Sequence, residues 1–112
     1  MDCLFCKMAA GEIPVNKVYE DDSVLAFYDI DPQAPVHFLV IPKQHIDGPA
    51  DITAQNSAVV AHIFAVIAKL AKELKLENGY RVVTNCGRDG GQSVMHLHFH
   101  VLAKRSLKWP PG

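Results

Sequence analysis

The sequence has almost no excess of charge and no long apolar run, and each of these shortages excludes a class of protein. Its 112 residues hold 11 lysines and arginines against 12 aspartates and glutamates, for a formal net charge of −1. A chain so near neutrality lacks the broad basic surface by which proteins bind nucleic acid. No segment approaches the roughly 20 apolar residues that span a bilayer, and Met1–Lys7 lacks a basic leader. We therefore expect a cytoplasmic protein that binds neither nucleic acid nor membranes.

Cysteine is scarce as well, with three residues in the chain, Cys3, Cys6 and Cys86. An odd count without signs of secretion indicates free thiols or metal ligands rather than a disulfide framework. Cys3 and Cys6 form a C-x-x-C pair, which can bind zinc, act as a redox couple, or simply be two thiols at the start of a helix. A redox role is disfavoured because no strand precedes the pair. We interpret Cys86 as a small filler residue beside a glycine-rich loop.

The composition that is present, 49% hydrophobic and 21% charged, is typical of one globular domain, here residues 1–112. Apolar residues recur at helical spacing between Thr53 and Leu76, in a stretch without glycine or proline, which predicts one long amphipathic helix. Candidate strands cluster before and after it, so the pattern favours an antiparallel α+β fold over a doubly wound parallel one. We predict a short helix over residues 2–10 and a five-stranded sheet with strands at 17–20, 24–28, 36–41, 80–84 and 96–102.

The last of these strands carries three histidines at a spacing of two. In an extended chain His96, His98 and His100 fall on one face, while the intervening Leu97, Phe99 and Val101 fall on the other. The spacing predicts a wet, reactive face backed by core, on which the three imidazoles share one site. His37, in the apolar strand at 36–41, is interpreted as a hydrogen-bonded scaffold residue, and His62 as a residue of the helix surface or packing.

Three imidazoles can divide the work of nucleophile, base and hydrogen-bond donor to a phosphate. The loop just upstream, residues 85–93, has glycines that permit close backbone approach and side-chain amides and a hydroxyl that can donate hydrogen bonds. This combination favours chemistry at a phosphate. Two other interpretations stay open: the histidines can share a metal ion, or they can be solvated residues on an exposed strand.

The motifs resemble those of one known family. The run His96–Leu102 matches the H-x-H-x-H motif that names the histidine triad superfamily, and further segments look like its nucleotide-binding branch. These segments cover nearly the whole chain: Phe27–Ile30, Pro32–Lys43 followed by His45, Asp89–Val94 and Trp109–Gly112.

The resemblance implies a purine nucleoside phosphoramidase, which cleaves the P–N bond of adenosine 5′-phosphoramidates to AMP and an amine without requiring a cofactor. His98 would be the nucleophile, forming a nucleotidyl-histidine that water resolves. His100 would hold a phosphate oxygen, His96 would position the nucleophile, and His45 would assist the leaving amine. Ser93 joins this catalytic set. The competing interpretation is a non-catalytic module that binds a purine nucleotide or a protein partner.

The resemblance also implies the residues that contact the nucleotide. Asp29 would bind the ribose hydroxyls, and four apolar side chains would enclose the base, although each of them can equally be ordinary core. The phosphate would be met by the loop and by the two later histidines. The apolar set is Phe5, Ile13, Phe27 and Ile30, and the phosphate set is Asn85, Gly91, Gln92, Ser93, His98 and His100.

Two further expectations come from the same resemblance. Cys3, Cys6, His45 and His96 would form a closed Cys₂His₂ tetrahedron around a structural zinc ion. A zinc-stabilised interaction domain is therefore a third class of function to weigh. Two copies of the histidine triad fold would pair through the long helix and a sheet edge, which makes the protein a homodimer with a continuous sheet.

Overall fold

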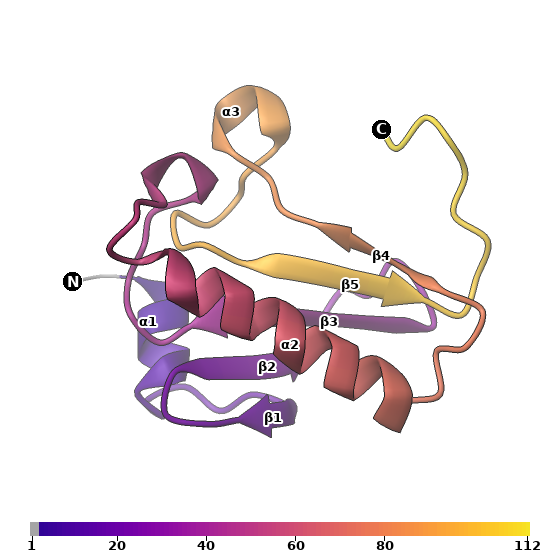
Figure 1. Cartoon of the computed structure of the whole chain (residues 1–112), viewed down its shortest axis with the longest axis horizontal. Helices are drawn as coiled ribbons and strands as arrows, with labels where there is room; N and C mark the ends of the chain where they lie inside the picture. The colour runs from indigo at the N-terminus through magenta and orange to yellow at the C-terminus, as the bar shows by residue number, and fades with distance from the viewer. Residues whose placement is uncertain (1–2) are drawn as a thin grey trace.

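The computed structural model describes residues 3–112, and its centre is one antiparallel sheet with helices on both faces (Figure 1). The strand order is β1-β2-β3-β5-β4, and every neighbouring pair is antiparallel, which confirms the predicted α+β fold. Within residues 3–112, three helices and one 3-10 turn accompany the five strands. In chain order the elements are α1 Leu4–Ala9, β1 Lys17–Glu20, β2 Val24–Tyr28, β3 Val36–Pro42, η1 Pro49–Asp51, α2 Ser57–Glu73, β4 Tyr80–Val83, α3 Gly87–Gly90 and β5 Phe99–Ala103.

The two faces of the sheet carry separate cores because successive strand residues point to opposite sides. Phe38 and Val40 of β3 pack in the larger core, which contains buried residues of α2, and the intervening Leu39 and Ile41 pack with Phe5 of α1 in the smaller one. The apolar run at 36–41 is therefore buried on both faces of the sheet. Figure 1 shows α2 lying across the front of the sheet and α1 behind it.

Helix α2 is shorter than the predicted span of 53–76. It begins at Ser57 because the Asn56 side chain accepts from the Thr53 amide at 2.7 Å and donates to the Asp51 carbonyl at 3.1 Å, which folds residues 53–56 into a turn. It ends at Glu73, and Lys75 adopts a left-handed conformation with φ of 58°. Within residues 3–112, no helix is long and apolar enough to cross a membrane.

The predicted strand 96–102 is also displaced. Its ladder with β3 begins at Phe99, opposite Val40, and the preceding segment leaves the sheet: the Leu97 amide donates to the Ile46 carbonyl at 2.6 Å. The loop predicted over 85–93 contains the one-turn helix α3, which ends at Gly91 in a left-handed conformation. Cys86 caps this turn and is exposed, so its interpretation as a filler residue is wrong.

Candidate functional site

A cavity of about 600 Å³ opens on the face of the sheet that α1 covers. Its size is within the range usual for small-molecule sites. Apolar side chains dominate its walls, and the polar groups come from the end of β2, from the segment after α3 and from the histidine run. The lining residues are Leu4, Phe5, Met8, Pro14, Val15, Asn16, Phe27, Tyr28, Asp29, Ile30, Leu39, Ser93, Val94, His98 and His100.

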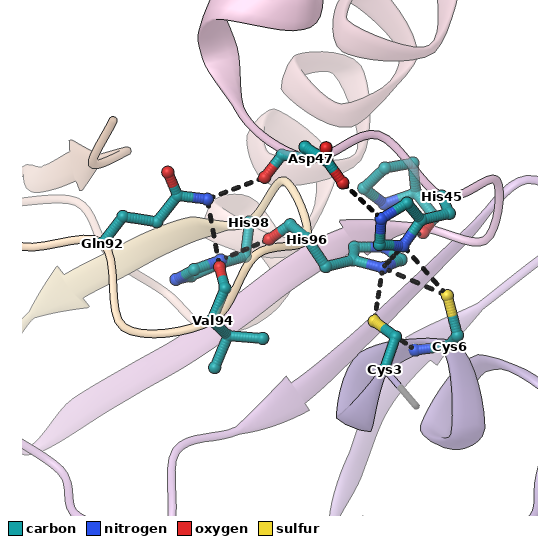
Figure 2. Close-up of polar contacts among 9 residues, drawn as sticks. Cys3, Cys6, His45, Asp47, Gln92, Val94, His96 and His98 are labelled. Carbon is teal, nitrogen blue, oxygen red and sulfur yellow. Dashed lines mark hydrogen bonds and ion pairs between the residues drawn. The ribbon is translucent and has the colours of Figure 1, made fainter. Parts of the chain in front are cut away.

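His98 lies in this cavity with only 3% of its surface exposed, and a backbone hydrogen bond fixes its tautomer. Its Nδ1 lies 2.7 Å from the carbonyl oxygen of His96 (Figure 2). A carbonyl only accepts, so Nδ1 must carry the proton and donate it. The other nitrogen, Nε2, keeps its lone pair. The backbone therefore holds His98 in the form that can act as a nucleophile or base.

His100 has the opposite tautomer, through a hydrogen-bond chain that starts at a backbone amide. The Gln33 amide donates to Nδ1 of His37 at 3.0 Å, so a neutral His37 carries its proton on Nε2. That Nε2 donates to Nδ1 of His100 at 2.9 Å and lies 3.5 Å from Asp29 Oδ2. His100 in turn carries its proton on Nε2. The ring centroids of His100 and His98 are 5.1 Å apart. The ring of His100, which carries a donor N–H, therefore lies beside the ring of His98, which carries the free Nε2 lone pair.

Burial keeps both rings of this chain neutral near pH 7. Removal from water, together with the nearby His98 and His37, lowers the pKa of His100 to about 4. Burial also lowers the pKa of His37, with Asp29 opposing the shift. The donor chain from Gln33 through His37 to His100 is thus intact under physiological conditions.

His96 belongs to a different site. It is fully buried, its Nε2 donates to the Pro42 carbonyl at 2.8 Å, and its Nδ1 faces two thiols (Figure 2). That nitrogen lies 3.3 Å from Cys3 Sγ and 3.5 Å from Cys6 Sγ. The expectation of one wet face shared by three histidines is therefore wrong: helix α1 covers the face, and the chain leaves the ladder before Phe99.

The cluster of Cys3, Cys6, His45 and His96 fits a tetrahedral zinc ion. Zinc–ligand bonds of ordinary length give sulfur–nitrogen separations of about 3.5 Å and a nitrogen–nitrogen separation of about 3.3 Å. The structure has sulfur–nitrogen distances of 3.3, 3.2 and 3.5 Å and 3.2 Å between the two Nδ1 atoms, and all four ligand atoms lie within 4.8 Å of one another.

The atoms behind this cluster also suit a metal. Nε2 of His45 bonds the Asp47 carboxylate at 2.6 Å, and Nε2 of His96 bonds a carbonyl, so each ring presents its Nδ1 lone pair to the centre. Burial, followed by the Cys3 thiol, raises the pKa of Cys6 to about 11, so a cation is what would stabilise the thiolate. Four protein ligands leave no open position, which is the arrangement of a structural site.

Gln92 ties the loop after α3 to the segment that carries His45. Its amide nitrogen donates to the Asp47 carbonyl at 2.7 Å and to the Val94 carbonyl at 3.0 Å, and its oxygen accepts from the Gly87 amide at 2.9 Å. Figure 2 shows Gln92 bonded to Asp47 and to Val94, and Asp47 bonded in turn to His45 of the metal cluster. The Gln92 side chain is fully engaged there, while the next residue, Ser93, lines the cavity.

The residues predicted for the site fall into two groups. Seven of them line the cavity: Phe5, Phe27, Asp29, Ile30, Ser93, His98 and His100. In the described part of the chain the others lie outside that lining: His45 and His96 in the metal cluster, Asn85, Gly91 and Gln92 around α3, and Ile13 in a smaller adjoining pocket of about 260 Å³. The predicted role of His45 beside a leaving amine therefore has no support in its position.

Sequence reasoning missed part of the wall and one hydrogen-bond partner. Leu4 and Met8 project from α1 into the cavity, and their spacing of one helical turn is a signal that could have identified them. His37 is buried and hydrogen-bonded, which confirms its interpretation as a scaffold residue, but its contact with His100, which fixes the tautomer of that ring, was not predicted. His62 lies on the surface and pairs with Asp21 at 2.7 Å, in agreement with its interpretation as a surface residue.

Comparison with known proteins gives a consistent assignment. The sequence model of the family described as "HIT domain" matches residues 10–107. A histidine triad protein from Clostridium difficile is 56% identical, with a TM-score of 0.94 and coverage of 96% of this chain and 95% of that one. A HIT family hydrolase from Legionella pneumophila Philadelphia 1 is 50% identical, with a TM-score of 0.97 over 99% and 100% of the two chains. An uncharacterized HIT-like protein of Synechococcus elongatus is 50% identical over 99% of this chain and 97% of its own length.

Proposed function

The chain belongs to the HIT domain family, and on that premise we propose that it is a purine nucleoside phosphoramidase. It would hydrolyse the P–N bond of an adenosine 5′-phosphoramidate to AMP and an amine. The single observation that carries the proposal is the pairing of two histidines in one cavity with opposite tautomers, His98 with a free lone pair and His100 with a free N–H.

The cavity suits the parts of a nucleoside. The rings of Phe5 and Phe27 lie edge to face at 5.6 Å, and together with Ile30 they offer an apolar wall to a purine base. Asp29 Oδ1 accepts from the Asp31 amide at 2.8 Å, which holds its carboxylate at the rim, where it can accept from both ribose hydroxyls.

The reaction proceeds in two displacements. Nε2 of His98 attacks the α-phosphorus, the new N–P bond forms, and the bond from phosphorus to the substrate amine breaks. Ser93 lines the cavity, and its hydroxyl can relay a proton from solvent water to the departing nitrogen, which leaves as the amine. Water then attacks the phosphorus of the nucleotidyl-histidine, the N–P bond breaks with its electron pair returning to Nε2, and the proton lost by the water returns to solvent as AMP leaves. Nε2–H of His100 donates to a phosphate oxygen as negative charge grows in each transition state.

No step of this scheme uses a cofactor. Zinc at the Cys₂His₂ cluster would serve to crosslink α1 to the segments that carry His45 and His96. We place the protein in the cytoplasm, because a reducing compartment keeps the thiols of Cys3 and Cys6 available as ligands.

The test is hydrolysis of an adenosine 5′-phosphoramidate that carries a fluorescent amine. His98→Ala should lower kcat by about 10³-fold or more while AMP still binds. The matched control is His62→Ala, which removes an exposed histidine on α2 and should leave kcat unchanged. Turnover that survives His98→Ala contradicts the mechanism. An unmodified protein that binds AMP without turnover supports the competing class, a non-catalytic nucleotide-binding module.

We also propose a homodimer with a continuous sheet. Strand β4 lies at the edge of the sheet, and Tyr80 on it and Phe64 on α2 are large hydrophobic residues with 41% and 47% of their surface exposed. An unpaired edge strand is a template for pairing with another chain. Sedimentation should give twice the monomer mass, and Tyr80→Asp with Phe64→Asp should shift it to the monomer. If the unmodified chain sediments as a monomer at every protein concentration tested, this proposal is contradicted.

A further inference from the structure

Helix α1 belongs to both sites at once. Cys3, at its N-cap, and Cys6, in its first turn, supply the two thiols of the metal cluster. Leu4, Phe5 and Met8 of the same helix form one wall of the cavity. A helix of six residues thus carries ligands for a metal and contacts for a nucleotide, with no intervening element.

Apart from the thiols, apolar packing anchors this helix to the sheet: Phe5 lies in the smaller core, and Met8 and Ala9 pack against it. Six residues are too few for a helix that is stable by itself. The Lys7 and Ala10 amides donate to the Cys3 and Cys6 carbonyls, so these hydrogen bonds are local. Phe5 is the buried helical residue, and its ring contacts the rings of Phe27 and His98, at centroid distances of 5.6 and 5.1 Å.

The polar contacts of the helix with distant segments are made by the thiols. Cys3 Sγ meets His96 Nδ1 at 3.3 Å, and Cys6 Sγ meets His45 Nδ1 at 3.2 Å. A thiol is a weak hydrogen-bond donor, so in a metal-free protein these contacts add little to the apolar packing that anchors α1. Coordination bonds in their place tie the helix to two segments far away in the sequence.

We propose that Cys3 and Cys6, by holding a zinc ion together with His45 and His96, fix α1 as the wall of the cavity and so make nucleotide affinity depend on the metal. This inference rests on the proposed function, because it takes a purine nucleotide as the occupant of the cavity. What the metal controls is how well ordered the cavity wall formed by Leu4, Phe5 and Met8 is. The nucleophile stays in place, because its tautomer depends on the His96 carbonyl within the same segment.

The coupling must be reciprocal. If zinc raises the affinity for AMP by some factor, AMP raises the affinity for zinc by the same factor. A coupling of about tenfold is expected, within the range that is usual between linked sites. In turnover the effect should fall on KM, while kcat at saturating substrate changes little.

The primary experiment measures AMP binding by calorimetry to the zinc-loaded protein and to the protein treated with a chelator. An AMP dissociation constant about tenfold larger in the chelated protein is expected. Equal constants in the two states overturn the inference while leaving the proposed function intact. Failure of the zinc-loaded protein to bind AMP at all overturns the proposed function as well, so the two failures are distinguishable.

Variants locate the coupling. Cys6→Ser should weaken AMP binding as chelation does, and Cys86→Ser, which changes an exposed thiol at α3, should not. Leu4→Ala, on the α1 wall, should reduce the ratio between the two metal states. Ile30→Ala, on the β2 side of the cavity, should weaken AMP binding equally in both states. A ratio that Leu4→Ala leaves at its full value overturns the assignment of α1 as the connecting element.

Amide hydrogen exchange in the same samples separates a local effect from general unfolding. Chelation should remove protection at the Lys7 and Ala10 amides, whose acceptors are the Cys3 and Cys6 carbonyls. Amides of β3 and β5 should keep their protection. Loss of protection in these strands too overturns the inference, because the metal would then support the whole fold rather than one wall.

Discussion

The contact between Gly48 and Gln92 allows a prediction in which the sign of a mutational effect reverses. Gly48 is buried, and a Cβ built on it would lie 3.0 Å from Gln92 Oε1 and 3.1 Å from Gln92 Nε2. Its backbone is extended, with φ of −177°, so an alanine there is free of backbone strain. The effect of Gly48→Ala therefore depends on whether the Gln92 side chain is in the way.

The magnitude follows from the hydrogen bonds that Gln92 would lose. Its side chain makes three, to Gly87, Asp47 and Val94, and each contributes about 0.5–1.5 kcal/mol. Gln92→Ala should therefore cost about 1.5–4.5 kcal/mol of unfolding free energy. Gly48→Ala should cost about 1–2 kcal/mol, because the amide must move and give up part of this network.

The double variant provides the decisive measurement. With Gln92→Ala already made, the three atoms nearest to the new Cβ are gone, and Gly48→Ala should be neutral or stabilising by up to about 0.5–1 kcal/mol through the unfolded state. Urea unfolding followed by circular dichroism gives the four free energies, provided that the m value is unchanged. Additivity of the two single effects within about 0.5 kcal/mol would refute the reasoning, because it would mean that Gly48 and Gln92 do not act on each other.

Three further predictions concern pH, a surface pair and metal content. The pKa of His100 is lowered to about 4 in the folded state, so the unfolded state binds more protons between about pH 6.5 and 4. The free energy of unfolding should therefore fall as pH falls through this window. Thermal melts of His100→Gln should show a weaker dependence on pH. Burial would raise the pKa of Asp21, but hydrogen bonds from His62 and from backbone amides hold it below its usual value. Asp21→Asn should therefore cost about 1–2 kcal/mol at pH 7, and the difference from the unmodified protein should shrink below about pH 3.8, where the contribution of the carboxylate is lost. Metal analysis should give one zinc per chain. Cys6→Ser should lower the affinity for zinc at least about tenfold, and Cys86→Ser should leave it unchanged. A protein that holds no zinc under saturating metal would contradict the assignment of the cluster.

The sequence could predict the elements of the fold because each has a local signature. The alternating and continuous apolar runs placed four of the five strands within one residue of their ends, and the absence of glycine and proline located α2. The ends of α2 were wrong because they depend on the Asn56 side chain and on a left-handed Lys75, which periodicity does not report. The displaced start of β5 depends on a bond from Leu97 to Ile46, a contact between distant segments.

The division of the three histidines could not be predicted for the same physical reason. A spacing of two tells which side chains share a face only while the backbone stays in the ladder, and His96 and His98 lie before the ladder begins. Whether that face of the sheet is exposed also depends on a distant part of the chain, because α1 covers it. The contact of His37 with His100 could not be predicted because His37 lies in a run that is buried on both faces. In such a run the apolar pattern does not show toward which side of the sheet a residue points.

Three chemically identical side chains acquire three roles through one hydrogen bond each. Nε2–H of His96 donates to the Pro42 carbonyl and leaves the Nδ1 lone pair facing the two thiols. Nδ1–H of His98 donates to the His96 carbonyl and leaves the Nε2 lone pair free, and His37 donates to Nδ1 of His100. An imidazole has one proton to place when neutral, so a single fixed partner decides whether the nitrogen that remains is a base or a donor. The role of each histidine is thus set by its partner rather than by its place in the motif. Substituting a partner should therefore alter the function of a histidine whose own position is unchanged.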